Sequence, residues 1–260
     1  MHLGTRHAQV GPLLEFLRTT RSDYLYIVGD LVDGWELRKS WYWEDSYNTL
    51  IQKILRKNRK RTRVVYITGN HDEFLESFLG LRFGGLRLVR EAIHEAADGR
   101  RYLVIHGHQF DGLTHFNRLL ERVGSEVYNW ILDLNLWFNR LRRRLGLGYW
   151  SLAAYLKSKA KSSVQYVTGY EEAMVRLAQA HQVDGIICGH IHRAEMRNIG
   201  GLEYLNCGDW VESCTALVED FSGHFSLIHF HENSVHGAGR GSGPHDSGAG
   251  PVPELVAVGT

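Results

Sequence analysis

The sequence predicts an α/β fold, on two observations. Four short β-branched or apolar runs, which are typical of buried strands, each end in small and ligand-type residues: 24–28, 63–68, 102–105 and 185–188. Between the first two runs, residues 46–60 carry apolar side chains at helical spacing: Leu50, Ile51, Ile54 and Leu55. Strand, helix and strand in this order indicate an α/β sheet, whose ligand sites form in loops beyond the carboxyl ends of the strands.

The second half of the chain differs in its pattern. Residues 112–170 hold many apolar residues near helical period and few strand signals, which predicts a helical insertion or lid inside one catalytic domain of residues 1–235. Strand-like pieces at 202–205, 215–218 and 225–230 predict a hairpin-rich return to the sheet. Gly, Ser, Pro and His dominate from residue 236, so we expect residues 236–260 to form a disordered tail.

Composition limits the classes of function. Lys plus Arg number 30 and Asp plus Glu number 29, so the whole molecule has no preference for polyanions. The cysteines are Cys188, Cys207 and Cys214, an odd number without CxxC spacing, which predicts neither a disulfide framework nor a thiolate zinc site. No apolar run is long enough to span a membrane, and no secretory signal is expected. These features favour the reducing cytoplasm, with peripheral contact at the inner membrane as a further expectation.

Five predicted loops carry side chains of the types that bind metals. They are residues 2–4, 29–33, 69–72, 106–108 and 189–192. Each supplies an oxygen or nitrogen donor suited to Mn²⁺, Fe²⁺ or Zn²⁺, and each contains glycine, which allows close approach of the backbone. Two cations about 3.5–4 Å apart can share a carboxylate and stabilise both the attacking and the leaving oxygen of a displacement. The clusters therefore predict hydrolysis of a phosphoester or phosphoanhydride.

The ordered series GDxxD, GNHD, HG and GHxH resembles that of the calcineurin-like metallophosphoesterases. The resemblance implies a metallophosphoesterase-type β-sandwich flanked by helices. It also implies two divalent metal ions, with Mn²⁺ expected and Fe²⁺ or Zn²⁺ as alternatives. In that family's pattern Asp30 matches the carboxylate that bridges the metals. The other implied ligands are His2 and His192 for the first metal and Asn70, His106 and His190 for the second.

The same resemblance implies roles for four further residues. His71 matches the catalytic histidine, which would protonate the leaving oxygen or stabilise transition-state charge from outside the metal shell. Asp72 is expected to orient the His71 ring, and Asp33 to support the ligands from outside that shell. His108 is ambiguous because family members carry either His or Asp there. We interpret it as a histidine that does not bind metal.

A narrower resemblance is to bacterial proteins related to UDP-2,3-diacylglucosamine diphosphatases. It rests on residues 34–35, 40–43, 83–85 and 206–213. The lipid A enzymes carry arginine where this chain has His71, so the closer likeness is to their paralogues. It implies hydrolysis of the pyrophosphate in a UDP-diacylglucosamine-like, lipid-linked nucleotide sugar. Alternatives are a phosphodiesterase or phosphatase acting on soluble nucleotides, and a catalytically inactive metal-binding scaffold.

The first motif departs from the family, whose pattern is Asp-x-His. Met1 stands at the middle position, so the aspartate would be the residue before it. We therefore expect a misassigned start codon, which would also remove a first strand from the inside of the sheet and impair this form. The alternative is a degenerate protein that has lost catalysis.

The expected insertion is basic and rich in aromatic residues. This composition favours a lid that contacts anionic lipid, and its candidate contact residues are Trp137, Phe138, Arg142, Arg143 and Arg144. The alternative is an ordinary amphipathic cap with solvated arginines. No nucleic-acid-binding motif accompanies the basic residues, so a nucleic-acid partner is not expected. The sequence leaves the oligomeric state open.

Overall fold

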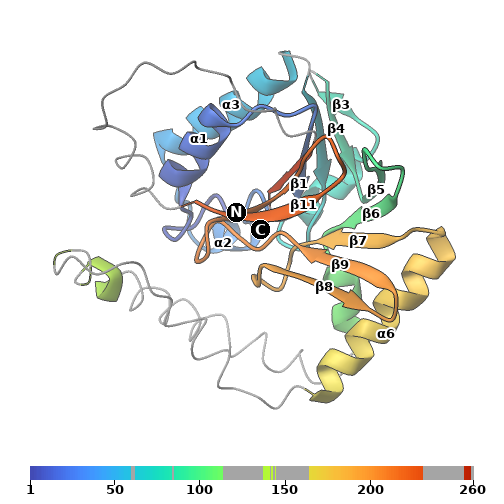
Figure 1. Cartoon of the computed structure of the whole chain (residues 1–260). Coiled ribbons are helices and arrows are strands. Elements are labelled where there is room, and N and C mark those ends of the chain that lie inside the picture. Colours follow the sequence, from blue (N-terminus) through green and yellow to red (C-terminus); the bar gives the residue numbers. More distant parts are fainter. Residues whose placement is uncertain are drawn as a thin grey trace.

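Two β-sheets face each other in this protein, with helices on the outer face of each sheet (Figure 1). The computed structural model describes residues 1–59, 62–83, 85–113, 137–140, 142, 144, 164–230 and 255–258. The helices are α1 (Val10–Thr19), α2 (Gly34–Lys39), α3 (Asp45–Arg59) and α6 (Val164–His181), with 3₁₀ turns η1 (Glu73–Phe78) and η2 (His108–Leu113).

The first sheet has the order β11-β10-β12-β1-β2-β4-β3. Its strands are β1 (Tyr24–Val28), β2 (Arg63–Ile67), β3 (Arg82–Phe83), β4 (Leu86–Val89), β10 (Thr215–Glu219), β11 (Phe225–His229) and β12 (Leu255–Val258). The second sheet has the order β5-β6-β7-β9-β8. Its strands are β5 (Glu91–Glu95), β6 (Arg101–Ile105), β7 (Gly185–Cys188), β8 (Glu195–Ile199) and β9 (Leu202–Asn206).

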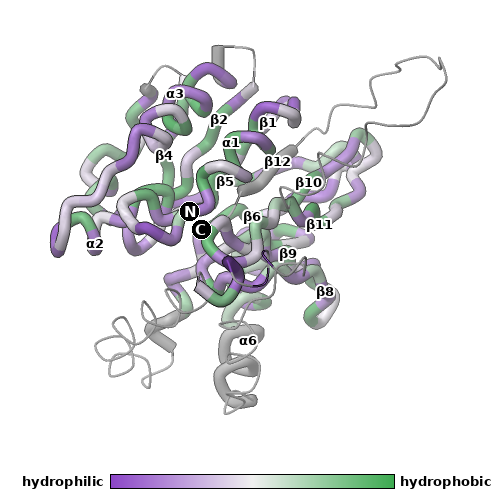
Figure 2. Tube along the Cα trace, turned by 90° about the vertical axis from the view of Figure 1, so that its left-hand side faces the viewer, coloured by the Kyte–Doolittle hydropathy of each residue, from purple (hydrophilic) through white to green (hydrophobic). Residues whose placement is uncertain are grey.

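Alternation along the strands builds three apolar layers. Along β1, Leu25 and Ile27 face α1 and α3, whereas Tyr26 and Val28 face the second sheet. Along β6, Tyr102 and Val104 pack in the layer between the sheets, and its other buried residues pack against α6. Helices α1 and α3 therefore present apolar faces inward, and their hydrophilic residues alternate with hydrophobic ones in Figure 2.

The strands β1, β2, β6 and β7 lie where the sequence predicts them. β1 pairs in parallel with β2, and β6 with β7, so the loops after these strands reach the same edge of the sandwich. The strands β3, β4, β5 and β8 carry no prediction because they are short or polar. The α/β fold class with helix-flanked sheets is confirmed.

The region expected to be a disordered tail contains one strand that the structure describes, β12, which lies between β1 and β10 and pairs with both. β1 therefore has a paired neighbour on each side, β12 and β2. An apolar run of only four residues, Leu255–Val258, is too short to be recognised within a Gly- and Pro-rich stretch.

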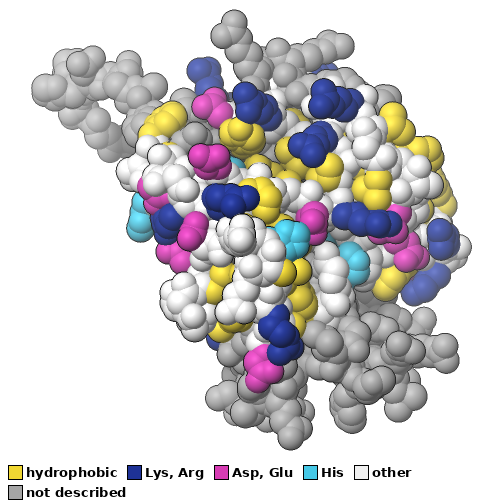
Figure 3. All heavy atoms as spheres, turned by 90° about the vertical axis from the view of Figure 1, so that its right-hand side faces the viewer, with side chains coloured by type: hydrophobic (Ala, Val, Ile, Leu, Met, Phe, Trp, Pro, Cys, Tyr) yellow, Lys and Arg dark blue, Asp and Glu magenta, His cyan; other side chains and the backbone are white. Residues whose placement is uncertain are grey.

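Most of the expected insertion lies outside the described residues, including Arg143. Trp137 and Arg144 are exposed, and the Arg142 guanidinium lies 5.7 Å from the centroid of the Phe138 ring. In the described part of the chain, no helix has both the length and the apolarity needed to cross a membrane. On the face seen in Figure 3, described basic and acidic side chains are interspersed.

Candidate metal centre

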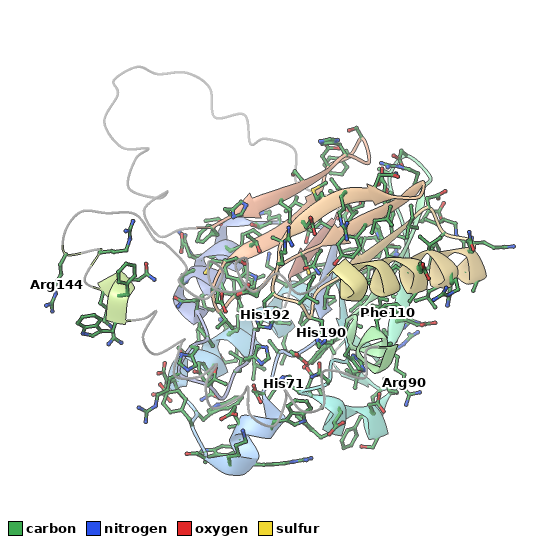
Figure 4. The ribbon with its side chains drawn as sticks, turned by 90° about the horizontal axis from the view of Figure 1, so that it is seen from below. His71, Arg90, Phe110, Arg144, His190 and His192 are labelled. Carbon is green, nitrogen blue, oxygen red and sulfur yellow. The ribbon has the colours of Figure 1, made fainter. Side chains whose placement is uncertain are left out.

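Loops from both sheets bring the predicted ligands together at one edge of the sandwich. Asp30 follows β1, Asn70 and His71 follow β2, and His106 follows β6. The loop after β7 adds His190 and His192. In Figure 4, His71, His190 and His192 gather in one central region, whereas Arg144 lies away from them.

Asp30 stands at the middle of two groups of donors. His2, Asp30 and His71 offer ligand atoms that all lie within 4.8 Å of one another, and so do Asp30, His106 and His190. Asp30 Oδ2 lies 3.3 Å from His106 Nε2 and 3.8 Å from His2 Nε2. A carboxylate common to both groups has the position needed to bridge two cations.

Hydrogen bonds fix which ring nitrogen of His106 and His2 faces the centre. His106 Nδ1 lies 2.9 Å from the Val28 carbonyl oxygen and donates to it. His2 Nδ1 is likewise 2.9 Å from Asp33 Oδ2, the acceptor of its proton. In the neutral form of each ring the lone pair is then on Nε2, which points toward Asp30. A hydrogen bond to the ring nitrogen that faces away from the centre is typical of histidines that bind metal.

The remaining ligand atoms complete the two groups. His106 Nε2 is 3.1 Å from Asn70 Oδ1, and His2 Nε2 is 3.3 Å from His192 Nε2. Each of the six predicted ligands therefore has a donor atom within 4.8 Å of a donor atom of another predicted ligand. His108 belongs to neither group, and its ring centroid lies 5.4 Å from that of His106.

The backbone is strained at four of the predicted ligands. His2, Asp30, His190 and His192 have φ values of 55°, 47°, 65° and 53°, in the left-handed region that non-glycine residues rarely adopt. Such conformations cost about 1–3 kcal/mol each and cluster at functional sites. The close approach of the loops also requires Gly69, because a Cβ there would lie 2.1 Å from Asp30 Oδ1.

Burial and charge set the protonation of the centre. Burial raises the pKa of Asp30, but His106, together with His2 and His71, outweighs it and holds that pKa well below its usual range. Burial lowers the pKa of His2 to about 4, so its ring is neutral near pH 7. An ionised carboxylate and a neutral imidazole are the forms that bind metals.

His71 lies at the open side of the centre. Its side chain is 23 % exposed, and its Nδ1 is 2.9 Å from Asp33 Oδ2. Burial lowers the pKa of His71, yet the carboxylates of Asp33 and Asp30 raise it by more. The Trp35 ring covers it, with centroids 4.2 Å apart at 34°. The sequence predicts no role for Trp35 at the centre, because no local pattern shows that a helical tryptophan stacks on a distant histidine.

The expected role of Asp72 needs correction, because Asp33 takes it. Asp72 is fully buried, and it accepts hydrogen bonds from the backbone amides of Leu31 and Gly69 and from the Tyr66 hydroxyl. It therefore ties the loop after β1 to the loop after β2. Asp33 Oδ2 instead lies beside both His2 and His71. The residue next to His71 in sequence points away from its ring, whereas Asp33 reaches it from the N-cap of α2.

Comparison with known proteins agrees with this arrangement. A family model described as calcineurin-like phosphoesterase matches residues 2–194. The chain belongs to the calcineurin-like phosphoesterase family.

Relatives within this family include proteins named UDP-2,3-diacylglucosamine hydrolase. The chain is 27% identical over 227 residues to one from Psychromonas ingrahamii, covering 81% of this chain and 86% of the relative. It is 30% identical over 215 residues to one from Actinobacillus succinogenes, covering 75% and 81%. Among solved structures, a Vps29 single mutant from Entamoeba histolytica matches at 16% identity with a TM-score of 0.42, covering 89% of this chain and 96% of that chain.

The donor set fits divalent metal ions. Calcineurin-like phosphoesterases use such ions, and the two groups that share Asp30 combine imidazole nitrogens with carboxylate and amide oxygens. Mixed nitrogen and oxygen ligands suit first-row transition metals, and the absence of thiolates at the centre excludes a soft, sulfur-based site among the described residues.

Proposed function

We propose that this protein is a dinuclear metal-dependent phosphohydrolase that cleaves the pyrophosphate of a lipid-linked nucleotide sugar of the UDP-diacylglucosamine type. The observation that carries the proposal is the sharing of Asp30 between two donor groups. The names of the relatives support the substrate class. Mn²⁺ is the proposed metal, because imidazole, amide and carboxylate donors suit it together with Fe²⁺ and Zn²⁺.

In this proposal His2, Asp30 and His192 hold one cation, and Asp30, Asn70, His106 and His190 hold the other. The bound cations would polarise the phosphoryl oxygens and supply a nucleophile from water at neutral pH. Hydrolysis then breaks one phosphorus–oxygen bond of the pyrophosphate and adds the oxygen of water to that phosphorus. The products are two phosphate monoesters.

His71 would donate a proton to the departing phosphate oxygen or stabilise its charge. Asp33 holds the ring by its 2.9 Å approach to Nδ1, which leaves Nε2 for the substrate. Trp35 is 37% exposed and its ring lies against that of His71, so it would contact the part of the substrate next to the leaving group.

The test compares substrates on the purified, Mn²⁺-loaded chain. UDP-2,3-diacylglucosamine should be hydrolysed faster than UDP-N-acetylglucosamine or a water-soluble nucleotide diester. The Asp30→Asn variant, which keeps the size of the side chain, serves as the control for contaminating phosphatases. Faster turnover of the soluble nucleotides would favour the second class of substrate. No turnover of any of the three, with two metals bound, would point to a binding scaffold.

The proposal includes contact between the insertion and an anionic membrane. Trp137 is 60% exposed and Arg144 is also exposed, so both are available to a lipid surface. Each basic residue near such a surface contributes about 1 kcal/mol. Changing Arg142, Arg143 and Arg144 to Ala should therefore weaken co-sedimentation with anionic vesicles, as added salt should. Hydrolysis of a soluble diester should remain, and unchanged sedimentation would show that these arginines are ordinary solvated charges.

A further inference from the structure

The loops after β1 and β2 must keep a fixed spacing, because each carries a predicted ligand. Asp30 lies in the first loop and Asn70 in the second. Asp30 Oδ1 accepts a hydrogen bond of 2.9 Å from the His71 amide, while Oδ2 faces the imidazole nitrogens of the centre. The shared carboxylate is therefore held by the loop after β2 as well as by its own loop. A shift between the two loops would move Asp30 relative to Asn70.

The Asp72 carboxylate joins the peptides beside these two ligands. Its Oδ2 accepts a hydrogen bond of 3.0 Å from the amide of Leu31, the residue after Asp30. Its Oδ1 accepts from the amide of Gly69, the residue before Asn70. Each oxygen of one buried carboxylate thus holds a different loop. Rotation of that carboxylate would release at least one of the two peptides.

The Tyr66 hydroxyl fixes the orientation of this carboxylate. It donates to Asp72 Oδ2, the same oxygen that holds the Leu31 amide. Tyr66 belongs to β2, is 5% exposed, and packs in the layer under α1 and α3. Burial, followed by the charge of Asp72, raises the pKa of Tyr66 well above its usual value. The hydroxyl therefore keeps its proton and acts as a donor.

Backbone strain at Asp30 explains why the loop needs this restraint. The φ of Asp30 is 47°, and such a conformation persists only where the surrounding structure determines it. Relaxation toward an ordinary φ would turn the following Leu31 amide away from Asp72 and rotate the carboxylate that the two donor groups share. A fixed Asp72 opposes this relaxation, and the Tyr66 hydroxyl is one of the groups that fix it.

We propose that Tyr66 is a positioning residue of the metal centre, which acts through Asp72 to hold Asp30 and Asn70 at the spacing that a cation needs. This role rests on the proposed function, in which Asp30 and Asn70 bind the same cation. That cation should depend on Tyr66 more strongly than the other one, because only its ligands come from both of the loops that Asp72 joins.

The test is Tyr66→Phe in the full chain, because this change removes the hydroxyl and keeps the ring in the core. Titration with Mn²⁺, followed by the electron paramagnetic resonance signal of the unbound ion, gives a dissociation constant for each cation. Asn70→Ala identifies the cation in question, since Asn70 would bind only one. Its dissociation constant should rise about 10–100-fold in Tyr66→Phe, the range typical of groups that support ligands, and the other constant should change far less.

The matched control is Tyr26→Phe. Tyr26 is a buried tyrosine of the adjacent strand β1, 2% exposed, and its hydroxyl faces His94 at 3.4 Å instead of the metal centre. This variant loses the same atom from the same sheet, so a general loss of stability should affect it in the same way. Both of its dissociation constants for Mn²⁺ should equal those of the parent.

A double-mutant cycle tests whether Tyr66 acts through Asp72. Asp72→Asn should weaken the same cation, and adding Tyr66→Phe should then have little further effect, because the carboxylate that the hydroxyl orients is already gone. Additive losses would show that the hydroxyl acts by some other contact, and would overturn the proposal. If Asp72→Asn did not fold, the comparison of Tyr66→Phe with Tyr26→Phe would still decide.

Three results of that comparison would overturn the proposal: unchanged constants in Tyr66→Phe, equal losses in Tyr66→Phe and Tyr26→Phe, or equal weakening of both cations. None of these measurements needs a substrate, so they hold whichever phosphate compound the protein hydrolyses. A parent chain that binds no Mn²⁺ would instead contradict the proposed function, and the role of Tyr66 with it.

Discussion

Two buried histidine–carboxylate pairs lie near the layer between the sheets, and their surroundings differ. His94 Nε2 is 2.7 Å from Glu219 Oε2, and Tyr26 approaches its other ring nitrogen. The second Glu219 oxygen accepts from the Ala97 amide. At the metal centre, by contrast, His106 Nε2 faces two acceptor oxygens, on Asp30 and Asn70. In the first pair both ring nitrogens and both carboxylate oxygens have partners, whereas in the second one ring nitrogen faces the oxygens of two different residues.

This comparison shows that a buried histidine–carboxylate pair does not by itself mark a metal site. Convergence of acceptor atoms does, because repulsion between them is relieved only by a cation or a proton. The backbone agrees with this distinction. His94 lies in a regular strand, whereas Asp30 is held at a φ of 47°. The comparison predicts that variants at the two pairs will separate function from stability.

The largest effect on function is expected from Asp30→Asn. The change keeps the size of the side chain but removes the charge that both donor groups share. Metal ions contribute several kcal/mol to catalysis of phosphoryl transfer, so activity should fall by about 10³-fold or more. Elemental analysis should show loss of metal at both positions, while circular dichroism remains that of the parent. Retention of both metals would contradict the bridging role.

His71→Gln should retain both metals and yet lose rate. A positioned proton donor contributes typically about 10²–10⁴-fold, and the effect should be greatest for substrates with poor leaving groups. Metal content and kcat measured on the same preparation would separate this variant from Asp30→Asn. Full turnover of a poor leaving group by His71→Gln would rule out its role as proton donor.

Glu219→Ala should differ from both variants of the metal centre: its metal content should be normal, but its fold should be less stable. Breaking a buried pair by removing one partner costs about 3–5 kcal/mol, because the other partner stays buried without its counterpart. Denaturant unfolding would measure the loss, and Glu219→Gln, which keeps an acceptor for Ala97, should lose less. A large loss of metal from Glu219→Ala at temperatures where it remains folded would show that the two pairs are coupled.

The sequence was sufficient for the parts of the site that depend on local signals. Asp30 and His106 each follow a short apolar run, so the rule for parallel strands placed them at one edge. It was not sufficient for contacts that only the tertiary structure determines. Asp72 follows His71 directly, but the backbone turns its carboxylate toward the Leu31 and Gly69 amides. The pairing of β12 with β1 joins opposite ends of the chain, and no local pattern encodes that pairing.

The smallest functional effect is expected from Asp33→Asn, which tests how a residue outside the metal shell orients the histidine rings of the centre. Asp33 Oδ2 lies 2.9 Å from Nδ1 of both His2 and His71, so one carboxylate orients a ligand and the proposed proton donor. Removal of such a supporting group typically costs about 10–100-fold in metal affinity or activity. Asp33 also caps α2 through its other oxygen, Oδ1, which accepts from the Glu36 amide, and the single oxygen of Asn can keep that cap. The NH2 group of Asn then replaces Oδ2 and cannot accept from either ring, so metal affinity and kcat should both fall, each less than in Asp30→Asn or His71→Gln. Titration with Mn²⁺ and measurement of kcat at saturating metal would divide the effect between the two rings. If saturating metal restored full kcat, Asp33 would act through His2 alone, and the approach of His71 to the same oxygen would have no catalytic consequence.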